Sequence, residues 1–116
     1  MMKLSKPSKE LAERILAEVG YDNRLIGFRL HERLGAIPLT MYSFEEVVRL
    51  LNSPNPRLDF NRLEEWVRKI MGDEELAGKI REAAEKGESD QERTRRIRYV
   101  MNERLSQCKT FSSAKS

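Results

Sequence analysis

The chain has 116 residues, 39% of them hydrophobic and 35% charged, and its formal net charge at pH 7 is +3. This length fits one domain, and the apolar content is too high for an intrinsically disordered chain. The single cysteine, Cys108, excludes an intrachain disulfide framework and favours a reducing compartment. Since no apolar run approaches the roughly 18 residues of a membrane span, we expect a cytoplasmic protein that makes no membrane contact.

The charges are distributed unevenly along the chain. Residues 1–71 carry 12 basic and 10 acidic groups, residues 72–92 carry 3 and 8, and residues 93–116 carry 7 and 1. An acidic block followed directly by a basic block favours two elements that attract each other over an anion-binding surface.

The amino-terminal third predicts two helices. Pro7 and Ser8 are typical of a helix start, and Gly20 is typical of a stop. The second helix is expected over residues 23–34, followed by Gly35 as a left-handed cap. Its apolar side would be formed by Leu25, Ile26, Leu30 and Leu34.

Two short runs in this region could also form strands. Gly27 weakens the second helix by about 1 kcal/mol relative to alanine, and LIGFRL around it tolerates β-structure. The stretch AIPLTMY, residues 36–42, is expected to be a connector, because Pro38 disfavours helix at the residue before it and there are too few turn residues for a hairpin. Because stronger helix signals flank both runs, we predict no sheet.

The rest of the chain predicts four more helices. Each begins at a residue whose side chain can cap a helix, and each continues with apolar residues at helical spacing. In two cases a glutamate three residues later completes a capping box. The prolines of NSPNPR, residues 52–57, form a stiff loop. The capping residues are Ser43, Asp59, Asp73 and Ser89.

These elements together predict an all-α fold, a compact single-domain bundle of five to six short helices. The helical domain would cover residues 1–108, and residues 109–116 would form a flexible polar tail. Trp66 falls on the same helical stripe as the apolar residues around it, so we expect it in the core. A binding groove formed by Trp66 and Met71 is the less favoured alternative.

The sequence lacks the groupings that catalysis and metal binding require. His31 is the only histidine, and we expect it half-exposed at the edge of a helix, while Cys108 is expected to be an incidental thiol. One histidine and one cysteine cannot supply the three or four nitrogen and sulfur ligands of a zinc site. The acidic GDEEL turn lacks the ligand spacing of a calcium loop. We therefore predict no enzymatic activity, no cofactor and no metal.

The last predicted helix, SDQERTRRIRYVMNERL, contains five arginines that scatter around the helix instead of lining one side. Arg93 and Arg104 fall in the apolar sector, where they can flank the core and neutralise the acidic block. Arg95, Arg98 and Tyr99 remain on the outer side, so we predict these three as partner-binding residues.

The function predicted from these observations is a non-enzymatic protein-interaction module, an adaptor, regulatory subunit or assembly factor that binds another protein through a charged helical surface. Self-association is possible. The alternative is a nucleic-acid-binding regulator that uses the arginine-rich last helix together with Lys3, Lys6 and Lys9. A helix-turn-helix around Gly72 is disfavoured, because its second helix would begin with three carboxylates that oppose phosphate.

Overall fold

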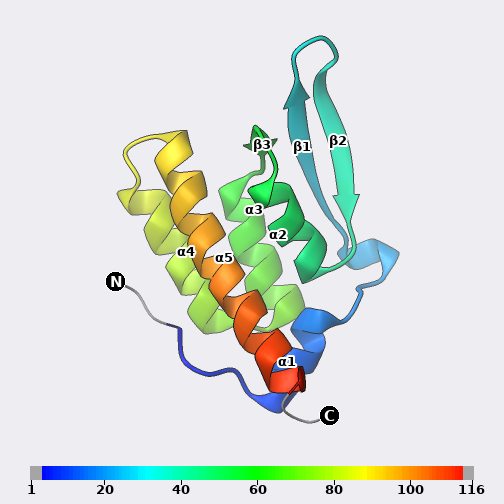
Figure 1. The fold of residues 1–116 in the computed structure, drawn as a ribbon, viewed down its shortest axis with the longest axis vertical. Coiled ribbons are helices and arrows are strands. Elements are labelled where there is room, and N and C mark those ends of the chain that lie inside the picture. The colour runs from blue at the N-terminus through cyan, green and yellow to red at the C-terminus, as the bar shows by residue number, and fades with distance from the viewer. Residues whose placement is uncertain (1–3, 114–116) are drawn as a thin grey trace.

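A computed structural model describes residues 4–113 and shows a helical body from which a β-hairpin projects (Figure 1). Five α-helices, two shorter helical turns and three strands follow one another along the chain. They are α1 (Lys9–Leu16), the 3-10 turn η1 (Tyr21–Asn23), β1 (Leu25–His31), β2 (Gly35–Met41), α2 (Phe44–Asn52), β3 (Pro56–Arg57), α3 (Phe60–Trp66), the π-helical turn η2 (Val67–Met71), α4 (Glu74–Lys86) and α5 (Asp90–Ser113).

The predicted all-α bundle is wrong, because the chain contains a three-stranded antiparallel sheet in the order β2-β1-β3. The segment expected as the second helix forms β1, and the expected connector forms β2. The two strands pair from Leu25 with Met41 to His31 with Gly35. Gly35 adopts the predicted left-handed conformation, with φ at 75°, but it does so after the hairpin loop and not at a helix end.

Pro38 is compatible with β2 because its backbone nitrogen faces away from β1. The backbone N–H of Leu30 donates to the carbonyl of Asn55, 3.2 Å away, on the β3 side of β1. The backbone N–H and C=O groups of successive residues alternate between the two sides of an antiparallel strand, so those of Phe28 also point toward β3. The backbone nitrogen of Pro38, the residue paired with Phe28, therefore points to the free edge of β2. An N–H missing at this edge removes no hydrogen bond from the sheet.

The predicted helix starts after the hairpin are confirmed. The side chains of Ser43, Asp59 and Asp73 accept hydrogen bonds from the first backbone N–H groups of α2, α3 and α4. Ser89 accepts one from the N–H of Glu92, 3.1 Å away, at the start of α5. Such caps satisfy N–H groups that have no partner within the helix, which explains why these boundaries can be predicted from local sequence.

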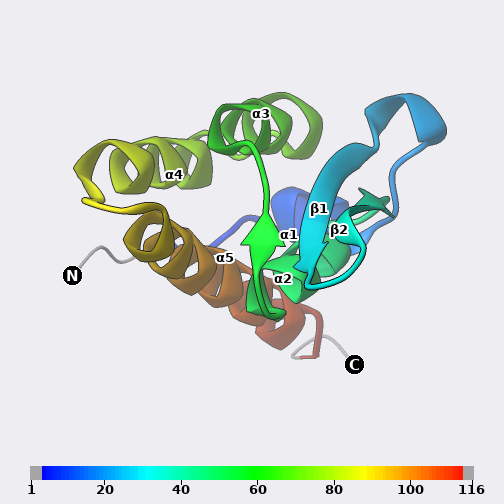
Figure 2. The same cartoon turned by 90° about the horizontal axis from the view of Figure 1, so that it is seen from above.

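The core lies where the helices meet, and α5 packs against α1, α2 and α4 (Figures 1 and 2). Trp66 is buried there, as expected, and its indole N–H donates to the Asn23 carbonyl at 2.7 Å. Met71 is buried as well. A groove formed by Trp66 and Met71 is therefore excluded.

Arg104 of α5 is almost fully buried and pairs with the acidic start of α4, as predicted. Its Nε lies 2.8 Å from Asp73 Oδ2, and its Nη2 lies 3.0 Å from Glu75 Oε1. Asp73 is 2% exposed, so both members of the first pair are removed from solvent. Arg93 also binds near its own helix start, donating to Asp90 and to the carbonyl of Ala84.

Two further features concern the ends and the surface of the molecule. α5 extends into the expected tail as far as Ser113, and Lys109 pairs with Glu45 at 3.0 Å. Residues 114–116 lie outside the described residues, so the flexibility of the tail stays a prediction.

Between residues 4 and 113, no helix combines the length and the apolar character needed to cross a bilayer.

Candidate interaction site

The β1–β2 hairpin has one buried face and one exposed face. Successive residues of a strand alternate between its two faces, so Leu25 and Gly27 lie on the same face. This face packs against α2 and is buried together with Met41. The opposite side, which we call the outer hairpin face, carries Ile26, Phe28, Leu30, Ala36 and Pro38.

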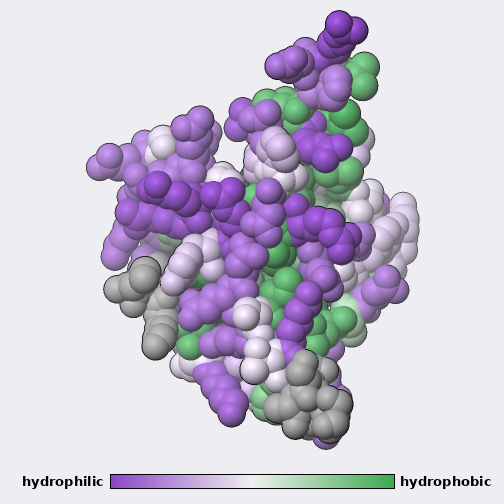
Figure 3. Space-filling model, viewed as in Figure 1, coloured by the Kyte–Doolittle hydropathy of each residue, from purple (hydrophilic) through white to green (hydrophobic). Residues whose placement is uncertain are grey.

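Apolar side chains dominate the outer hairpin face. Ile26 is 41% exposed, Phe28 40% and Leu30 38%, and Leu34 at the tip is 71% exposed. In Figure 3, hydrophobic surface extends along the projecting hairpin, while hydrophilic residues cover its tip and much of the visible helical body. Exposed apolar groups gathered on one face are typical of a protein-interaction surface, whereas single scattered ones are ordinary.

His31 lies at the end of β1 and not on a helix edge as expected. Its ring is exposed, and Nδ1 accepts the backbone N–H groups of Arg33 and Leu34 at 3.2 and 3.3 Å. The imidazole therefore caps the hairpin loop.

The three predicted partner-binding residues of α5 lie near one another on its outer side. Arg95 is exposed, Tyr99 is 51% exposed and Arg98 is half-buried. Within residues 4–113, no carboxylate lies within ion-pair distance of Arg95 or Arg98, whereas Arg96 pairs with Glu92 at 3.1 Å.

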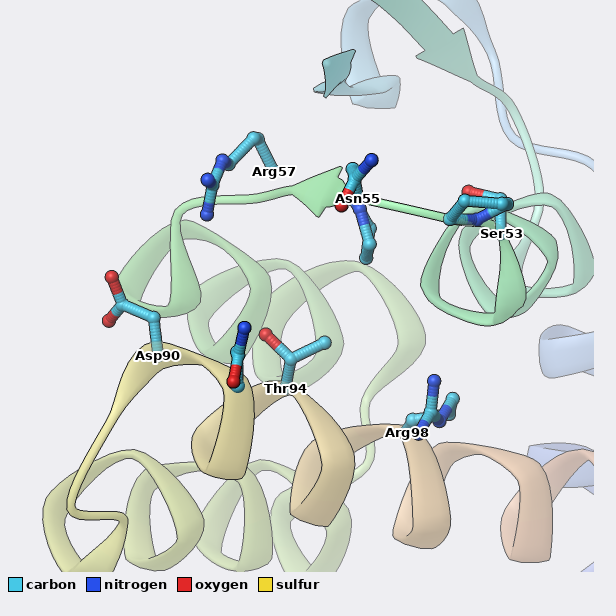
Figure 4. A pocket seen from close by; sticks show the side chains of 9 residues that line it. Ser53, Asn55, Arg57, Asp90, Thr94 and Arg98 are labelled. Carbon is cyan, nitrogen blue, oxygen red and sulfur yellow. The ribbon is translucent and has the colours of Figure 1, made fainter. Parts of the chain in front are cut away.

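Arg98 also lines a polar hollow between α5 and the loop that contains β3 (Figure 4). This loop hollow has a volume of about 310 Å³, and its opposite wall is formed by residues 53–57. In Figure 4, Thr94 projects from α5 toward the loop that carries Asn55. Asn55 has φ at 54°, a left-handed conformation that asparagine tolerates better than most residues.

A second hollow of about 230 Å³ lies between β2 and α2, and we call it the hairpin hollow. Leu39, Met41 and Leu50 give it an apolar lining, and Arg29 and Arg49 also border it. Ser53 contributes to both hollows.

Cys108 is fully buried in the core of the helical body. Burial raises the pKa of its thiol to about 11, an effect that nearby Arg104 opposes and Asp73 reinforces. A thiol with that pKa stays protonated near neutral pH, and only the thiolate is strongly nucleophilic. The described part of the chain holds no group of three or more metal-ligating side chains.

Comparisons with protein-family models, with curated proteins and with solved structures found no match. The candidate site is therefore inferred from the exposure and contacts of this chain's residues alone. Arg95, Arg98 and Tyr99 of α5 stay a prediction from the sequence, whereas the outer hairpin face was missed because β1 was expected to be a helix. The alternation of Ile37, Leu39 and Met41 with less apolar residues was the available signal for a strand.

Proposed function

We propose that this protein is a non-enzymatic protein-interaction module, an adaptor, regulatory subunit or assembly factor, whose main contact element is the hairpin. The observation that supports this most directly is the outer hairpin face, where Ile26, Phe28 and Leu30 are each about two-fifths exposed on one side of a projecting element. Covering such side chains with a partner removes apolar surface from water, the dominant favourable term in most protein association.

The same proposal places the protein in the cytoplasm, where an unpaired thiol such as Cys108 stays reduced. Arg95, Arg98 and Tyr99 would form a second, more polar contact region on α5. Tyrosine and arginine are enriched among the residues that dominate binding energy at interfaces.

Site-specific photo-crosslinking in the cell of origin tests the hairpin. We expect a benzoylphenylalanine in place of Phe28 to give discrete protein adducts, and the same residue in place of Arg81 on α4 to give none. Arg81 is a suitable control because its side chain is 64% exposed and lies on another element. Substituting Ile26→Ser and Leu30→Ser should abolish the Phe28 adducts.

Equal adducts at both positions, or adducts that survive the serine substitutions, would contradict the proposal. Adducts with the mass of two copies of this chain would show that the hairpin mediates self-association. Sedimentation across a range of concentrations would then measure how strong that association is.

The alternative is nucleic-acid binding. It is favoured by Arg95 and Arg98, which have no carboxylate within ion-pair distance among residues 4–113. Lys6 and Lys9 are exposed, whereas Lys3 lies outside the described residues. A gel-shift titration across salt tests it, because binding through phosphates weakens steeply as salt rises. Loss of the shift on Arg95→Glu and Arg98→Glu would support this alternative, and no shift at low salt would remove it.

A further inference from the structure

Four arginines line the two hollows, which share Ser53 as a lining residue. Arg57 and Arg98 line the loop hollow, and Arg29 and Arg49 line the hairpin hollow. Among the described residues, none of the four guanidinium groups has a carboxylate within ion-pair distance. Elsewhere on the surface such pairs are common, as between Lys69 and Glu65.

The carboxylates that line the hollows are already engaged by other groups. Asp90 Oδ1 accepts a hydrogen bond from Arg93 Nη1 at 3.0 Å, and Glu46 Oε1 accepts the backbone N–H of Tyr42 at 2.7 Å. Glu45, which neighbours Glu46 in the sequence, also feels the charge of Arg49 but is paired with Lys109 at 3.0 Å. The lining residues themselves are four arginines and two carboxylates, an excess of two positive charges. An excess of positive charge beside concave surface concentrates anionic groups there.

The chemistry of the linings distinguishes between anionic partners. Proteins that bind a single strand of nucleic acid commonly stack its bases on aromatic side chains, and neither hollow has one among its described lining residues. Phe60 lines a third hollow that shares Pro56, Arg57, Asp90 and Thr94 with the loop hollow, so an oligothymidylate serves as a comparison probe below. The hairpin hollow instead offers Leu39, backed by Met41 and Leu50, which are 3% and 4% exposed, and this apolar floor suits an aliphatic side chain. The planar guanidinium group is well matched to carboxylates, which it can bind through two parallel hydrogen bonds.

We infer that the two hollows bind an acidic segment of a partner protein, with an aliphatic side chain in the hairpin hollow and carboxylates on the surrounding arginines. This inference rests on the proposed function only in requiring a protein partner, since it uses a different surface from the outer hairpin face. The segment would lie in the hollows and not extend the sheet, because Pro38 removes an N–H from the free edge of β2.

Amide chemical-shift titration of the full chain tests the inference with a synthetic probe. The probe is a short acetylated peptide of aspartates and glutamates around one leucine. The comparison probes are the same peptide with serine in place of leucine and an oligothymidylate of equal charge. We expect saturable shifts centred on Arg29, Arg49, Ser53, Arg57 and Arg98, and weaker binding of the serine peptide.

Charge reversal then identifies the groups responsible. Arg49→Glu with Arg98→Glu should weaken the leucine peptide at least about tenfold. Arg62→Glu with Arg81→Glu makes the same change in net charge on exposed residues of α3 and α4 outside the hollows, and it should leave binding within about twofold, as expected for distant sites. The amide spectrum also reports folding. If charge reversal unfolds the chain, Arg49→Gln with Arg98→Gln should still weaken binding.

Four results would overturn the inference. These are no saturable shifts, shifts centred away from Ser53, an equal loss of binding in the control variant, or tighter binding of the oligothymidylate at the same arginines. The last result would identify nucleic acid as the occupant. Photo-crosslinking at Phe28 does not depend on these arginines, so failure here is distinguishable from failure of the proposed function.

Discussion

Gly27 shows how one residue fixes the position of the hairpin on the helical body. A Cβ atom at this position would lie 2.6 Å from Leu50 Cδ2 of α2, 3.1 Å from Met41 Cε and 3.3 Å from the carbonyl of Arg57. The absence of a side chain therefore lets β1 approach α2 closely. In the sequence the same glycine only weakened a predicted helix, because its use depends on residues distant along the chain.

We predict that Gly27→Ala lowers the free energy of unfolding by about 1 to 3 kcal/mol, the usual cost of overpacking a well-packed core. Urea denaturation followed by circular dichroism measures it. Gly78→Ala is the matched control, because nothing lies within 4 Å of a Cβ at this site in α4. That change should stabilise the protein by up to about 1 kcal/mol. Equal stability of the Gly27→Ala variant and the parent would show that α2 and the hairpin can shift apart to accommodate the added Cβ atom at no cost in free energy.

At the scale of elements, the helices after the hairpin could be predicted from local sequence, whereas the alternation of Ile37, Leu39 and Met41 was the one weak signal for the hairpin. Helix starts depend on short-range bonds such as that from the Glu46 N–H to Ser43 Oγ, so local sequence contains the signal. The strands depend on pairing across the hairpin and with β3, and the spacing of Leu25, Ile26 and Leu30 fits a helix equally well. The two hollows combine residues from β1, β2, α2, the β3 loop and α5, so no single segment could reveal them.

The free edge of β2 gives a prediction at the same scale. Pro38→Thr adds an N–H to the outward side of an edge strand, where unpaired donors and acceptors can pair with another chain. We expect a greater increase in sedimentation coefficient with concentration for this variant than for the parent. Ala36→Thr introduces the same residue on the same edge without adding an N–H, so it should sediment like the parent. Equal self-association of the two variants would mean that the added side chain, and not the added donor, is responsible.

At the scale of the whole molecule, Arg104 links three segments that are distant in sequence. Besides Asp73 and Glu75 at the start of α4, it donates from Nη1 to the carbonyl of Ser5 at 2.7 Å. Glu75 accepts bonds from the backbone N–H and the hydroxyl of the same Ser5. The amino-terminal segment is thereby joined to both α4 and α5. Removing one partner of a buried ion pair leaves the other charge uncompensated, which costs about 3 to 5 kcal/mol.

Glu75 makes this junction sensitive to acid. Partial burial raises the pKa of its carboxyl group, but the hydrogen bonds from Ser5 and the contact with Arg104 outweigh burial, so the net pKa lies below the ordinary value of 4.5. The folded protein therefore binds fewer protons at Glu75 than the unfolded chain does. The resulting stabilisation is complete above about pH 4.5 and is lost as pH falls through the lower folded pKa.

We therefore expect the parent to lose stability below about pH 4.5 more steeply than Glu75→Gln does. The variant should be the less stable of the two at neutral pH, and the difference between them should shrink towards pH 3. Urea denaturation at a series of pH values measures both curves. Glu85→Gln is the control, because Glu85 is 68% exposed and lies 3.8 Å from Arg81 within one helix. This control should follow the parent at every pH, and a Glu75→Gln curve parallel to the parent's would show that another carboxylate governs the acid response.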